Sequence, residues 1–350
     1  MSHSTHKRPT PSSENELQST LEMTVHDAES SKASCSSCYK KVKTSLSEED
    51  EASQSTSQPS ISSYIGRNEI LQRIENNSYK IPYIYKDVDV IVIDKPYDLH
   101  IDGNYTLTVE KLVNTQYPEM ENPPVENITK PKRGFTPSKR KLKFCHQLDY
   151  ATSGILCLAF TRSSCANISQ CFQQRTAKKK YLAVVRGHIE SESSFDVTSW
   201  IEEDPSDENK FKMRNYYKGL EKTPVGELKT DEEIKAASNS KESFTHAQVL
   251  KKGFYHVGGS QKLESDTPSE TLKIPVTKVL LTPSTGRRHQ LRLHMQLYGT
   301  PILGDGTYGH NEEGIHRMML HAWSLSLPGV LEKELVTTDP FEDANYFEWE

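Results

Sequence analysis

Asp149 lies in a short polar stretch whose residue types are those of a reactive site. Residues 146–154 read HQLDYATSG and lead directly into the apolar run ILCLAF at 155–160. A carboxylate held in a turn at the edge of a buried strand can act as a nucleophile, a base or a metal ligand. Such an aspartate can equally do no more than hydrogen-bond the backbone of its own turn. The residues by themselves leave these interpretations open.

A second stretch, TGRRHQLRLH at residues 285–294, places five basic-type side chains within eight positions. It opens a predicted helix with an apolar face, and Arg292 lies at the edge of that face. A partly buried guanidinium needs a carboxylate or phosphate partner, and Asp149 is the carboxylate we expect. The alternative is a solvated face that binds phosphate. His289 and His294 are five positions apart and do not share a helix face, so no metal site is predicted.

Both stretches adjoin segments that predict the fold. Continuous apolar or β-branched runs are typical of buried strands, and helical spacing of apolar residues indicates amphipathic helices. The two kinds of segment mix without a strict β-α-β rhythm, which favours an α+β domain with a mixed, largely antiparallel sheet flanked by helices. No GxGxxG or GxxxxGK[ST] motif occurs, so a nucleotide-cofactor site is not expected. The expected strands are 88–93, 155–160, 181–185, 276–282 and 318–327, and the expected helices are 164–175 and 288–298.

The composition of the chain changes along its length. Residues 1–63 are rich in Ser and Thr, lack Phe and Trp, and contain six basic and nine acidic residues, so we predict a disordered tail. That acidity argues against a mitochondrial presequence and favours the cytoplasm or nucleus. The CxxC at Cys35 and Cys38 is half of a zinc site, and we interpret it as two free thiols. The predicted divisions are a tail at 1–63, a folded domain at 81–330 with a mobile basic loop at 118–143 and a partly ordered, charged insertion at 202–242, and a C-terminal tail at 331–350.

The average composition hides an uneven distribution of charge. The chain has 34% hydrophobic residues and a formal net charge of −5, which by itself argues weakly against a nucleic-acid binder. Residues 190–208, however, contain eight acidic and no basic residues, whereas residues 130–143 contain seven basic and no acidic ones. The acidic total therefore conceals basic surface that RNA phosphates would bind. Six Cys without a pairing rhythm indicate a reducing compartment, and no apolar run is long enough to span a membrane.

Five blocks of this sequence resemble the RluA-type pseudouridine synthases. The family pattern HRLD-x-x-TSG corresponds to residues 146–154, and the pattern GR-x-HQ-[LI]-R-x-H…G-x-P-[IL]-x-GD…YG corresponds to residues 286–309. The resemblance covers residues 81–328, and within the family the sequence is most similar to the eukaryotic RNA pseudouridylate synthase domain-containing proteins. Three further blocks match in the same order: KP at 95–96, YLAVVRG at 181–187 and LHA at 320–322.

The resemblance implies an enzyme that isomerises uridine to pseudouridine in tRNA or rRNA, acting as a monomer without metal, nucleotide cofactor or membrane. Asp149 would be the nucleophile or charge stabiliser at C1′, and Arg292 would pair with it. Tyr181 would stack under the uracil and take part in removing the C5 proton, and Leu320 would pack on the other side of the base. The target base must leave its stack. The implied base contacts are His146, Gln147, His289 and Gln290, and the implied phosphate contacts are Lys178, Lys179, Lys180 and the loop at 130–143.

One position departs from the family pattern. Gln147 stands where the family has an arginine whose expected role is to fill the space left by the flipped uridine, so a charge is missing there. This departure favours, as an alternative, a catalytically silent RNA-binding protein on the same fold, although the three catalytic candidates are all present. A hydrolase that uses Asp149 with His146 or His289 is a weaker alternative, because the sequence has neither a nucleophile elbow nor a second paired carboxylate.

Overall fold

The computed structural model describes one folded unit of the chain. The contacts place Gln58–Glu350 in a single unit, and the described residues are 67–76, 78–121, 140–190, 193–216, 239–259, 272–310 and 314–350. The predicted tail at 1–63 with its CxxC, most of the basic loop at 118–143 and the middle of the insertion at 202–242 lie outside the described residues. No helix within the described ranges is long and apolar enough to cross a membrane.

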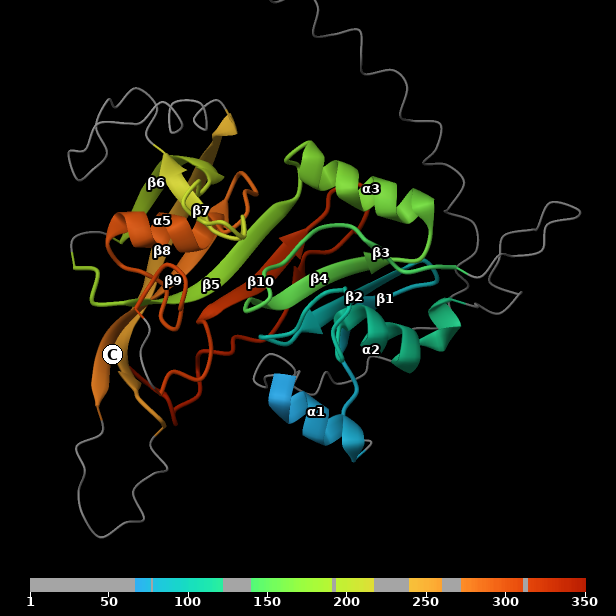
Figure 1. The fold of residues 1–350 in the computed structure, drawn as a ribbon, viewed down its shortest axis with the longest axis horizontal. Coiled ribbons are helices and arrows are strands. Elements are labelled where there is room, and N and C mark those ends of the chain that lie inside the picture. Colours follow the sequence, from blue (N-terminus) through green and yellow to red (C-terminus); the bar gives the residue numbers. More distant parts are fainter. Residues whose placement is uncertain are drawn as a thin grey trace, which may run out of the picture. The chain divides into compact units, whose positions relative to one another are not determined.

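A single large sheet runs through this unit (Figure 1). Neighbouring strands are antiparallel except for β4 and β10, which are parallel, so the predicted mixed and largely antiparallel sheet is confirmed. In sheet order the strands are β1 (Tyr83–Lys86), β2 (Val90–Lys95), β4 (Ser153–Ala159), β10 (Leu320–Ser326), β5 (Lys178–Arg186), β9 (Lys273–Pro283), β8 (Lys241–His256), β6 (Ser194–Glu203) and β7 (Met213–Tyr216). Three short strands pair beside this row: β3 (Lys143–Phe144) with β4, β11 (Leu335–Val336) with β10, and β12 (Phe347–Trp349) with β8.

Helices cover both faces of the half of the sheet that contains β2 and β4 (Figure 1). On one face, α1 (Arg67–Glu75) and α2 (Val109–Gln116) pack with Ile91 and Leu156 in one apolar cluster. On the other face, α3 (Arg162–Gln173) joins a cluster with Val92 and Cys157. Successive side chains of a strand point to opposite faces, so both strands are buried along their whole length. For this reason Val90–Ile93 of β2 and Ile155–Ala159 of β4 are continuous apolar runs in the sequence.

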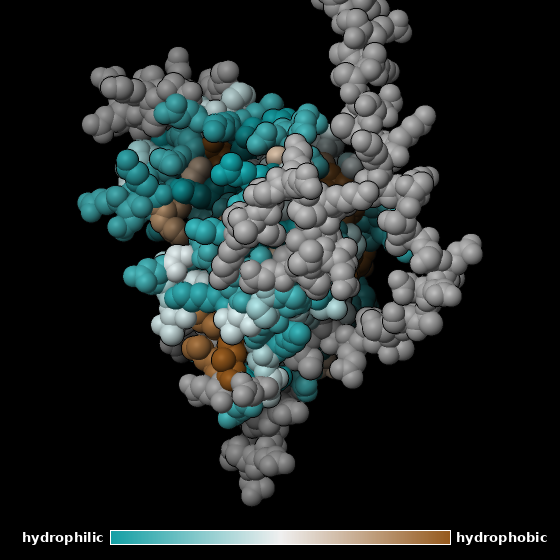
Figure 2. All heavy atoms as spheres, turned by 90° about the vertical axis from the view of Figure 1, so that its right-hand side faces the viewer, coloured by the Kyte–Doolittle hydropathy of each residue, from teal (hydrophilic) through white to brown (hydrophobic). Residues whose placement is uncertain are grey.

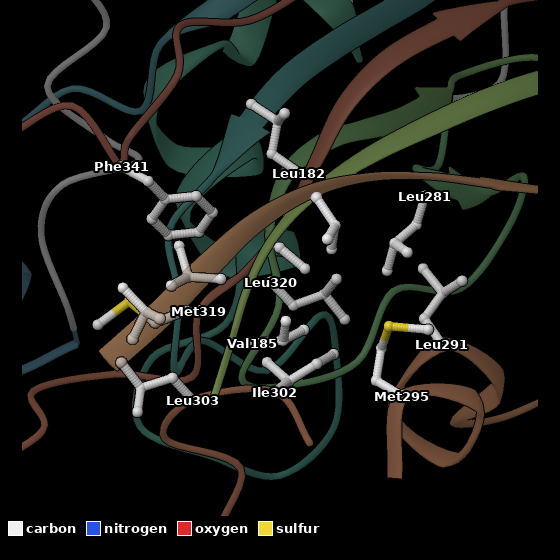
Figure 3. Packing of buried hydrophobic residues seen from close by; sticks show 14 of the residues in the cluster. Leu182, Val185, Leu281, Leu291, Met295, Ile302, Leu303, Met319, Leu320 and Phe341 are labelled. Atoms are coloured by element: carbon white, nitrogen blue, oxygen red, sulfur yellow. The ribbon is translucent and has the colours of Figure 1, made fainter. Parts of the chain in front are cut away.

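The other half of the sheet carries α5 (Gln290–Tyr298). Leu291 and Met295 of this helix pack in the largest apolar cluster, which Figure 3 shows around Leu320. The helix ends, as predicted, at Gly299, whose φ of 93° is the left-handed conformation that favours glycine at this cap. It begins at Gln290 rather than at 288 because the preceding residue, His289, has a φ of 58°.

Strand β10 joins the two halves of the sheet at a close backbone contact. Its parallel pairing with β4 brings Gly154 opposite Ala322. Gly154 has a φ of 108°, and a Cβ atom there would lie 2.3 Å from the carbonyl oxygen of Ala322, so only glycine fits. The hydroxyl of Ser153 lies 2.7 Å from Nδ1 of His321 and also accepts a hydrogen bond from Arg317. The TSG and LHA blocks therefore fasten the start of β4 to β10.

The acidic segment after residue 190 contains a strand that the sequence analysis missed. In β6, Phe195 and Val197 are buried while Asp196 is exposed, which is the period of two of a half-buried strand. The many acidic residues of the surrounding segment 190–208 concealed that period. Residues 202–216 of the predicted, partly ordered insertion continue β6 into β7. Glu202 is buried there and accepts a hydrogen bond from Nε of Arg214 over 2.9 Å.

Residues 331–350 belong to the folded domain, so the predicted boundary at 330 is corrected. They contribute β11 and β12 to the sheet, and Phe341 and Phe347 to the cluster that contains α5. Lys278 of β9 is buried, and its ammonium donates hydrogen bonds to Asp339 and Glu342. The aromatic residues of this segment supply buried area, and its acidic residues pair with a lysine that would otherwise be buried without a partner.

Large apolar side chains are scattered thinly over the described surface. Figure 2 shows the face on the right of Figure 1, where hydrophilic residues cover most of the coloured area and apolar patches are small. Two exposed tyrosines, Tyr105 and Tyr150, lie in the loops that follow β2 and precede β4. Single exposed apolar residues are normal for a folded domain, whereas grouped ones indicate a binding surface.

Candidate active site

Asp149 lies in the loop that leads into β4, and its neighbours hold this loop in place. The Nε2 atom of His146 accepts a hydrogen bond from the backbone N–H of Cys157 over 3.0 Å, and the imidazole ring stacks on Phe172 of α3. Burial lowers the pKa of His146 to about 4, so the ring is neutral. Leu148 packs against the apolar cluster of α2. The side chain of Asp149 itself is 26% exposed, so a fixed backbone presents an accessible carboxylate.

Lys95, the last residue of β2, ties two loops together, a role that its KP block did not predict. Its buried ammonium donates to the carbonyl oxygens of Pro96, Leu99 and Tyr150 over 2.9, 3.0 and 2.9 Å. Burial lowers the pKa of Lys95 to about 7, and the charge of Asp98 opposes this shift. The sequence held a signal for this role, because a lysine at the end of a buried apolar strand needs partners inside the protein.

Arg292 of α5 contacts two carboxylates. Its Nη1 lies 3.4 Å from Oδ2 of Asp149, which is the contact that the sequence predicted. The shorter hydrogen bonds go to Asp305, from Nε to Oδ2 over 2.7 Å and from Nη2 to Oδ1 over 2.8 Å. The side chains of Arg292 and Asp305 are only 6% and 1% exposed. Asp305 therefore takes the bidentate fork of the guanidinium, and Asp149 takes the remaining nitrogen.

Asp305 belongs to the family block at residues 286–309, and the sequence predicted no role for it. Its Oδ1 also accepts hydrogen bonds from the backbone N–H groups of Thr307 and Tyr308, over 2.9 and 3.1 Å. Burial opposes ionisation, but the hydrogen bonds from Arg292 and from these amides lower the pKa of Asp305. Burial likewise opposes the charge of Arg292, whose pKa is nevertheless raised by Asp305 and then by Asp149. The buried pair is thus fully ionised.

Tyr181 of β5 completes the group of predicted catalytic residues. It lies opposite Ala322 of β10, and its ring packs against the same apolar cluster as α5. Burial and the negative charge of Asp149 both raise the pKa of Tyr181. The phenol is therefore protonated. The structure places Arg292 in contact with Asp149, and the charge of Asp149 acts on Tyr181; the catalytic roles of the three residues stay a prediction.

His289 is buried beside this group and supports Arg292. Its Nδ1 lies 2.7 Å from the hydroxyl of Tyr308, and that hydroxyl accepts the backbone N–H of Met213. The phenol can donate its proton to Nδ1 of His289, which corresponds to the tautomer with the imidazole proton on Nε2. Burial lowers the pKa of His289 to about 4, which keeps the ring neutral. The guanidinium of Arg292 lies over the ring of Tyr308 at 4.8 Å.

Gln290 uses its whole amide inside the protein. Its Nε2 donates to the carbonyl oxygen of Phe244 and to the hydroxyl of Thr245, both over 3.0 Å. Its Oε1 accepts from the hydroxyl of Thr285 and from the backbone N–H of Arg287. These four bonds exhaust the hydrogen-bonding capacity of the amide. In this structure Gln290 therefore fastens the start of α5 to β8, and no part of the amide is left for the RNA contact that the sequence predicted.

The other predicted RNA contacts divide into exposed and internal residues. Leu320 is 3% exposed and packs in the core cluster of Figure 3. Gln147, by contrast, is exposed on the loop of Asp149. Lys178 is exposed at the start of β5, and Lys180 forms an ion pair of 3.0 Å with Glu334. Of these residues, Gln147 and Lys178 are exposed.

This arrangement presents one accessible carboxylate beside a buried, ionised guanidinium. Such a carboxylate can attack an electron-poor carbon or stabilise the positive charge that develops there. Asp305 already balances the positive charge of the guanidinium. Asp149 contacts only the one nitrogen that remains. Within the described ranges, no group of three or more His, Cys, Asp and Glu side chains could hold a metal ion.

Comparison with known proteins gives one consistent family. The model of the RNA pseudouridylate synthase family matches residues 89–297. RNA pseudouridylate synthase domain-containing protein 1 of Bos taurus is 36% identical over 265 residues, which cover 74% of this chain and 71% of that protein. The dual-specificity RNA pseudouridine synthase RluA of Haemophilus influenzae is 28% identical over 284 residues, covering 77% and 98%. The solved human RNA pseudouridylate synthase domain containing 1 superposes with a TM-score of 0.56 at 31% identity, covering 77% of this chain and 88% of that one.

Proposed function

Because this chain belongs to the RNA pseudouridylate synthase family, we propose that it isomerises a uridine of a structured tRNA or rRNA with Asp149 as the catalytic nucleophile. Family membership makes the protein a pseudouridine synthase, an isomerase that modifies RNA. The residue roles and the kind of RNA are the proposal. One observation carries it: the carboxylate of Asp149 is accessible and lies 3.4 Å from a guanidinium that a second carboxylate already neutralises.

In the proposed reaction no atom is gained or lost. The N1–C1′ bond of the uridine breaks, the uracil turns, a C5–C1′ bond forms, and the C5 proton moves to N1. Positive charge develops at C1′ as the first bond breaks, and the carboxylate of Asp149 meets it by attack at C1′ or by assisting a glycal-like intermediate. Arg292 keeps this carboxylate aimed, since its guanidinium is fixed by Asp305 and stacked over Tyr308.

Tyr181 is proposed to pack against the uracil. Burial and Asp149 raise the pKa of its phenol, so the neutral form prevails and a free phenolate base would be rare. A neutral aromatic ring next to the carboxylate suits stacking and hydrogen-bond donation better than unaided proton removal from C5. The proposal for Tyr181 therefore favours positioning of the base.

RNA binding is proposed to use the exposed predicted contacts. Extrusion of the target base costs a few kcal/mol, which phosphate contacts and groups that occupy the vacated space offset. Gln147 is exposed two residues before Asp149 and can hydrogen-bond to bases, although it lacks the charge of the family arginine. Lys178 supplies an exposed charge at the start of β5.

The test is pseudouridine formation on unmodified transcripts. Wild-type protein and Asp149→Asn are incubated with tRNA and rRNA transcripts, which are then digested to nucleosides and separated by chromatography. We expect pseudouridine with the wild type and none with Asp149→Asn, while both bind RNA alike. Turnover by Asp149→Asn would contradict the nucleophile assignment. The alternative, a catalytically silent RNA-binding protein, is favoured by Gln147 alone, and it predicts RNA binding without pseudouridine for both proteins.

A further inference from the structure

Three aromatic rings form a stack on the two loops that Lys95 ties together. The rings of His100 and Tyr105 are parallel within 5° at a centroid distance of 3.6 Å. His100 also lies 4.4 Å from the ring of Tyr150, at an angle of 41°. Tyr150 immediately follows Asp149, whereas the other two rings come from the loop between β2 and α2. The stack therefore begins one residue from the candidate nucleophile.

Both outer residues of the stack are exposed. Tyr105 is 48% exposed and Tyr150 is 41% exposed. They are two of the few large apolar residues that are exposed on the described surface. An aromatic side chain that serves only packing buries most of its large area in the core. A row of rings with exposed ends instead resembles the platforms on which proteins stack the bases of single-stranded RNA.

The backbone holds these rings in position before any ligand arrives. The ammonium of Lys95 donates to Leu99, the residue before His100, and also to Tyr150, so one buried group fixes both loops. The carbonyl oxygen of His100 accepts the backbone N–H of Val109 at the start of α2 over 2.9 Å. A platform that is already ordered adds little entropic cost to binding.

A positive charge lies next to the stack. The ammonium of Lys111 donates a hydrogen bond to the carbonyl oxygen of Tyr105, and the lysine side chain is exposed. An RNA base on the platform brings its phosphate with it, and an exposed ammonium beside the ring would bind that phosphate. The combination of ring faces and a cation fits a nucleotide better than an apolar peptide.

We propose that the Tyr105–His100–Tyr150 stack is the platform for the unpaired base that flanks the target uridine. The inference rests on the proposed function, since it takes Asp149 as the position of the target nucleotide. Tyr150 directly follows Asp149 in the chain, so we place a base stacked on its ring next to the nucleotide whose C1′ faces Asp149. Every nucleobase has a π face, so the platform supplies affinity and positioning for flanking bases of any identity.

The experiment measures RNA binding in a protein that cannot turn over. All variants carry Asp149→Asn in the full chain, and the probe is a short single-stranded oligouridine with 2-aminopurine at its centre. Tyr150→Leu and Tyr105→Leu remove an aromatic face but keep apolar bulk, and Tyr150→Phe keeps the ring. Tyr83→Leu is the matched control, because Tyr83 is 49% exposed and lies outside the stack on β1. Thermal melting checks that each variant is folded.

We expect each of the two leucine variants to bind the probe about five- to tenfold more weakly, the loss of one stacked base. Tyr150→Phe and Tyr83→Leu should stay within about twofold of the parent protein, since neither removes a ring from the platform. The fluorescence of 2-aminopurine should be quenched by the parent and less so by Tyr150→Leu. Equal affinity of the leucine variants, or an equal loss in Tyr83→Leu, would overturn the proposal.

A second probe separates stacking from phosphate binding. Replacing the central nucleotide with an abasic one keeps every phosphate but removes one base, so the parent should bind it more weakly and Tyr150→Leu should bind both probes alike. If the parent does not distinguish the two probes, the platform does not bind a base. Absence of pseudouridine with the wild-type protein would contradict the proposed function but not these binding results, so the two failures are distinguishable.

Discussion

Asp149 and Asp305 share the guanidinium of Arg292, but the two loops treat their carboxylates differently. The carboxylate of Asp305 is 1% exposed and accepts two hydrogen bonds from the arginine and two from backbone amides. That of Asp149 is 26% exposed and has one contact of 3.4 Å with the same arginine. Because Asp305 is buried and its hydrogen bonds all go to the protein, a substrate cannot reach its carboxylate. The comparison thus separates a carboxylate that balances charge from one that is available for chemistry.

The loops also differ in how they position their aspartates. The turn of Asp305 is closed by the side chain itself, which bonds the amides of Thr307 and Tyr308. The loop of Asp149 is held through its other residues, by His146 on the backbone of β4 and by Lys95 on the carbonyl of Tyr150. The side chain of Asp149 therefore contributes little to its own placement. Substitution should affect the two positions in opposite ways.

The largest expected effect is the loss of turnover in Asp149→Asn without loss of stability. The amide is isosteric and removes the charge that the proposed reaction needs, so single-turnover pseudouridine formation should fall by at least about a thousandfold. Urea unfolding should show a change in the free energy of unfolding within about 0.5 kcal/mol, because only a long, partly exposed contact is altered. A large loss of stability would show that the two carboxylates are not distinct in role.

Asp305→Asn should do the reverse and destabilise the fold. It leaves the buried guanidinium of Arg292 without its principal counter-charge, which costs about 3–5 kcal/mol. The free energy of unfolding from urea titration measures this loss, and Asp149→Asn is the matched control on the same arginine. If Asp305→Asn were as stable as the wild type, Asp149 would have to carry the pairing, and the proposed division of roles would fail.

Lys95→Met tests whether the backbone of the loop positions Asp149. The substitution leaves the carbonyl oxygen of Tyr150 without its donor, so the carboxylate is held less firmly. We expect kcat to fall roughly tenfold, since misplacement of Asp149 acts on the chemical step, and KM to rise as well, because the same ammonium holds the proposed aromatic platform for RNA. Lys80→Met, an exposed lysine near β1, is the control. A change in KM alone would indicate that Lys95 acts on RNA binding and not on the placement of Asp149.

Much of the fold could be predicted because burial leaves a direct pattern in the sequence. Strands β2 and β4 are covered on both faces and contain continuous apolar runs, and the end of α5 is marked by Gly299. β6 was missed because it lies within the acidic segment 190–208, whose charge outweighed the alternation of buried Phe195 and Val197 with exposed residues. A strand buried on one face shows only an alternation of apolar and polar residues, which is harder to recognise than the continuous apolar run of a strand buried on both faces. Charged residues nearby make such an alternation harder still to recognise.

The candidate site could be predicted only as far as residue type determines position. The contact between Asp149 and Arg292 followed from the need of a half-buried arginine for a carboxylate. The stronger partner, Asp305, could not be ranked above it, because that depends on which carboxylate the turn places against the fork of the guanidinium. His146 and Gln290 have the side chains of RNA-contacting residues, but their hydrogen bonds go to β4 and β8. Polar residues in a motif can serve the fold as readily as the substrate.

The smallest expected effect is on stability at acidic pH. Lowering the pH should remove the stabilising contribution of the buried histidines before it affects the Asp305–Arg292 pair. Burial lowers the pKa of His294 to about 4, below the ordinary 6.5. The neutral ring therefore contributes its full stability above pH 6.5, and this contribution is lost as the pH falls towards 4. Between pH 7 and pH 5 the loss should be about 1–2 kcal/mol. The pKa of Asp305 is lowered from 3.8, so the contribution of that pair is lost only at more acidic pH. Urea unfolding at pH 7 and pH 5 should therefore show a lower free energy of unfolding at pH 5 for both the wild type and Asp305→Asn, with a constant difference between them. If the difference in free energy of unfolding between the two proteins shrinks at pH 5, the Asp305–Arg292 pair depends on the buried histidines. Asp305 would then not stabilise the fold independently of them.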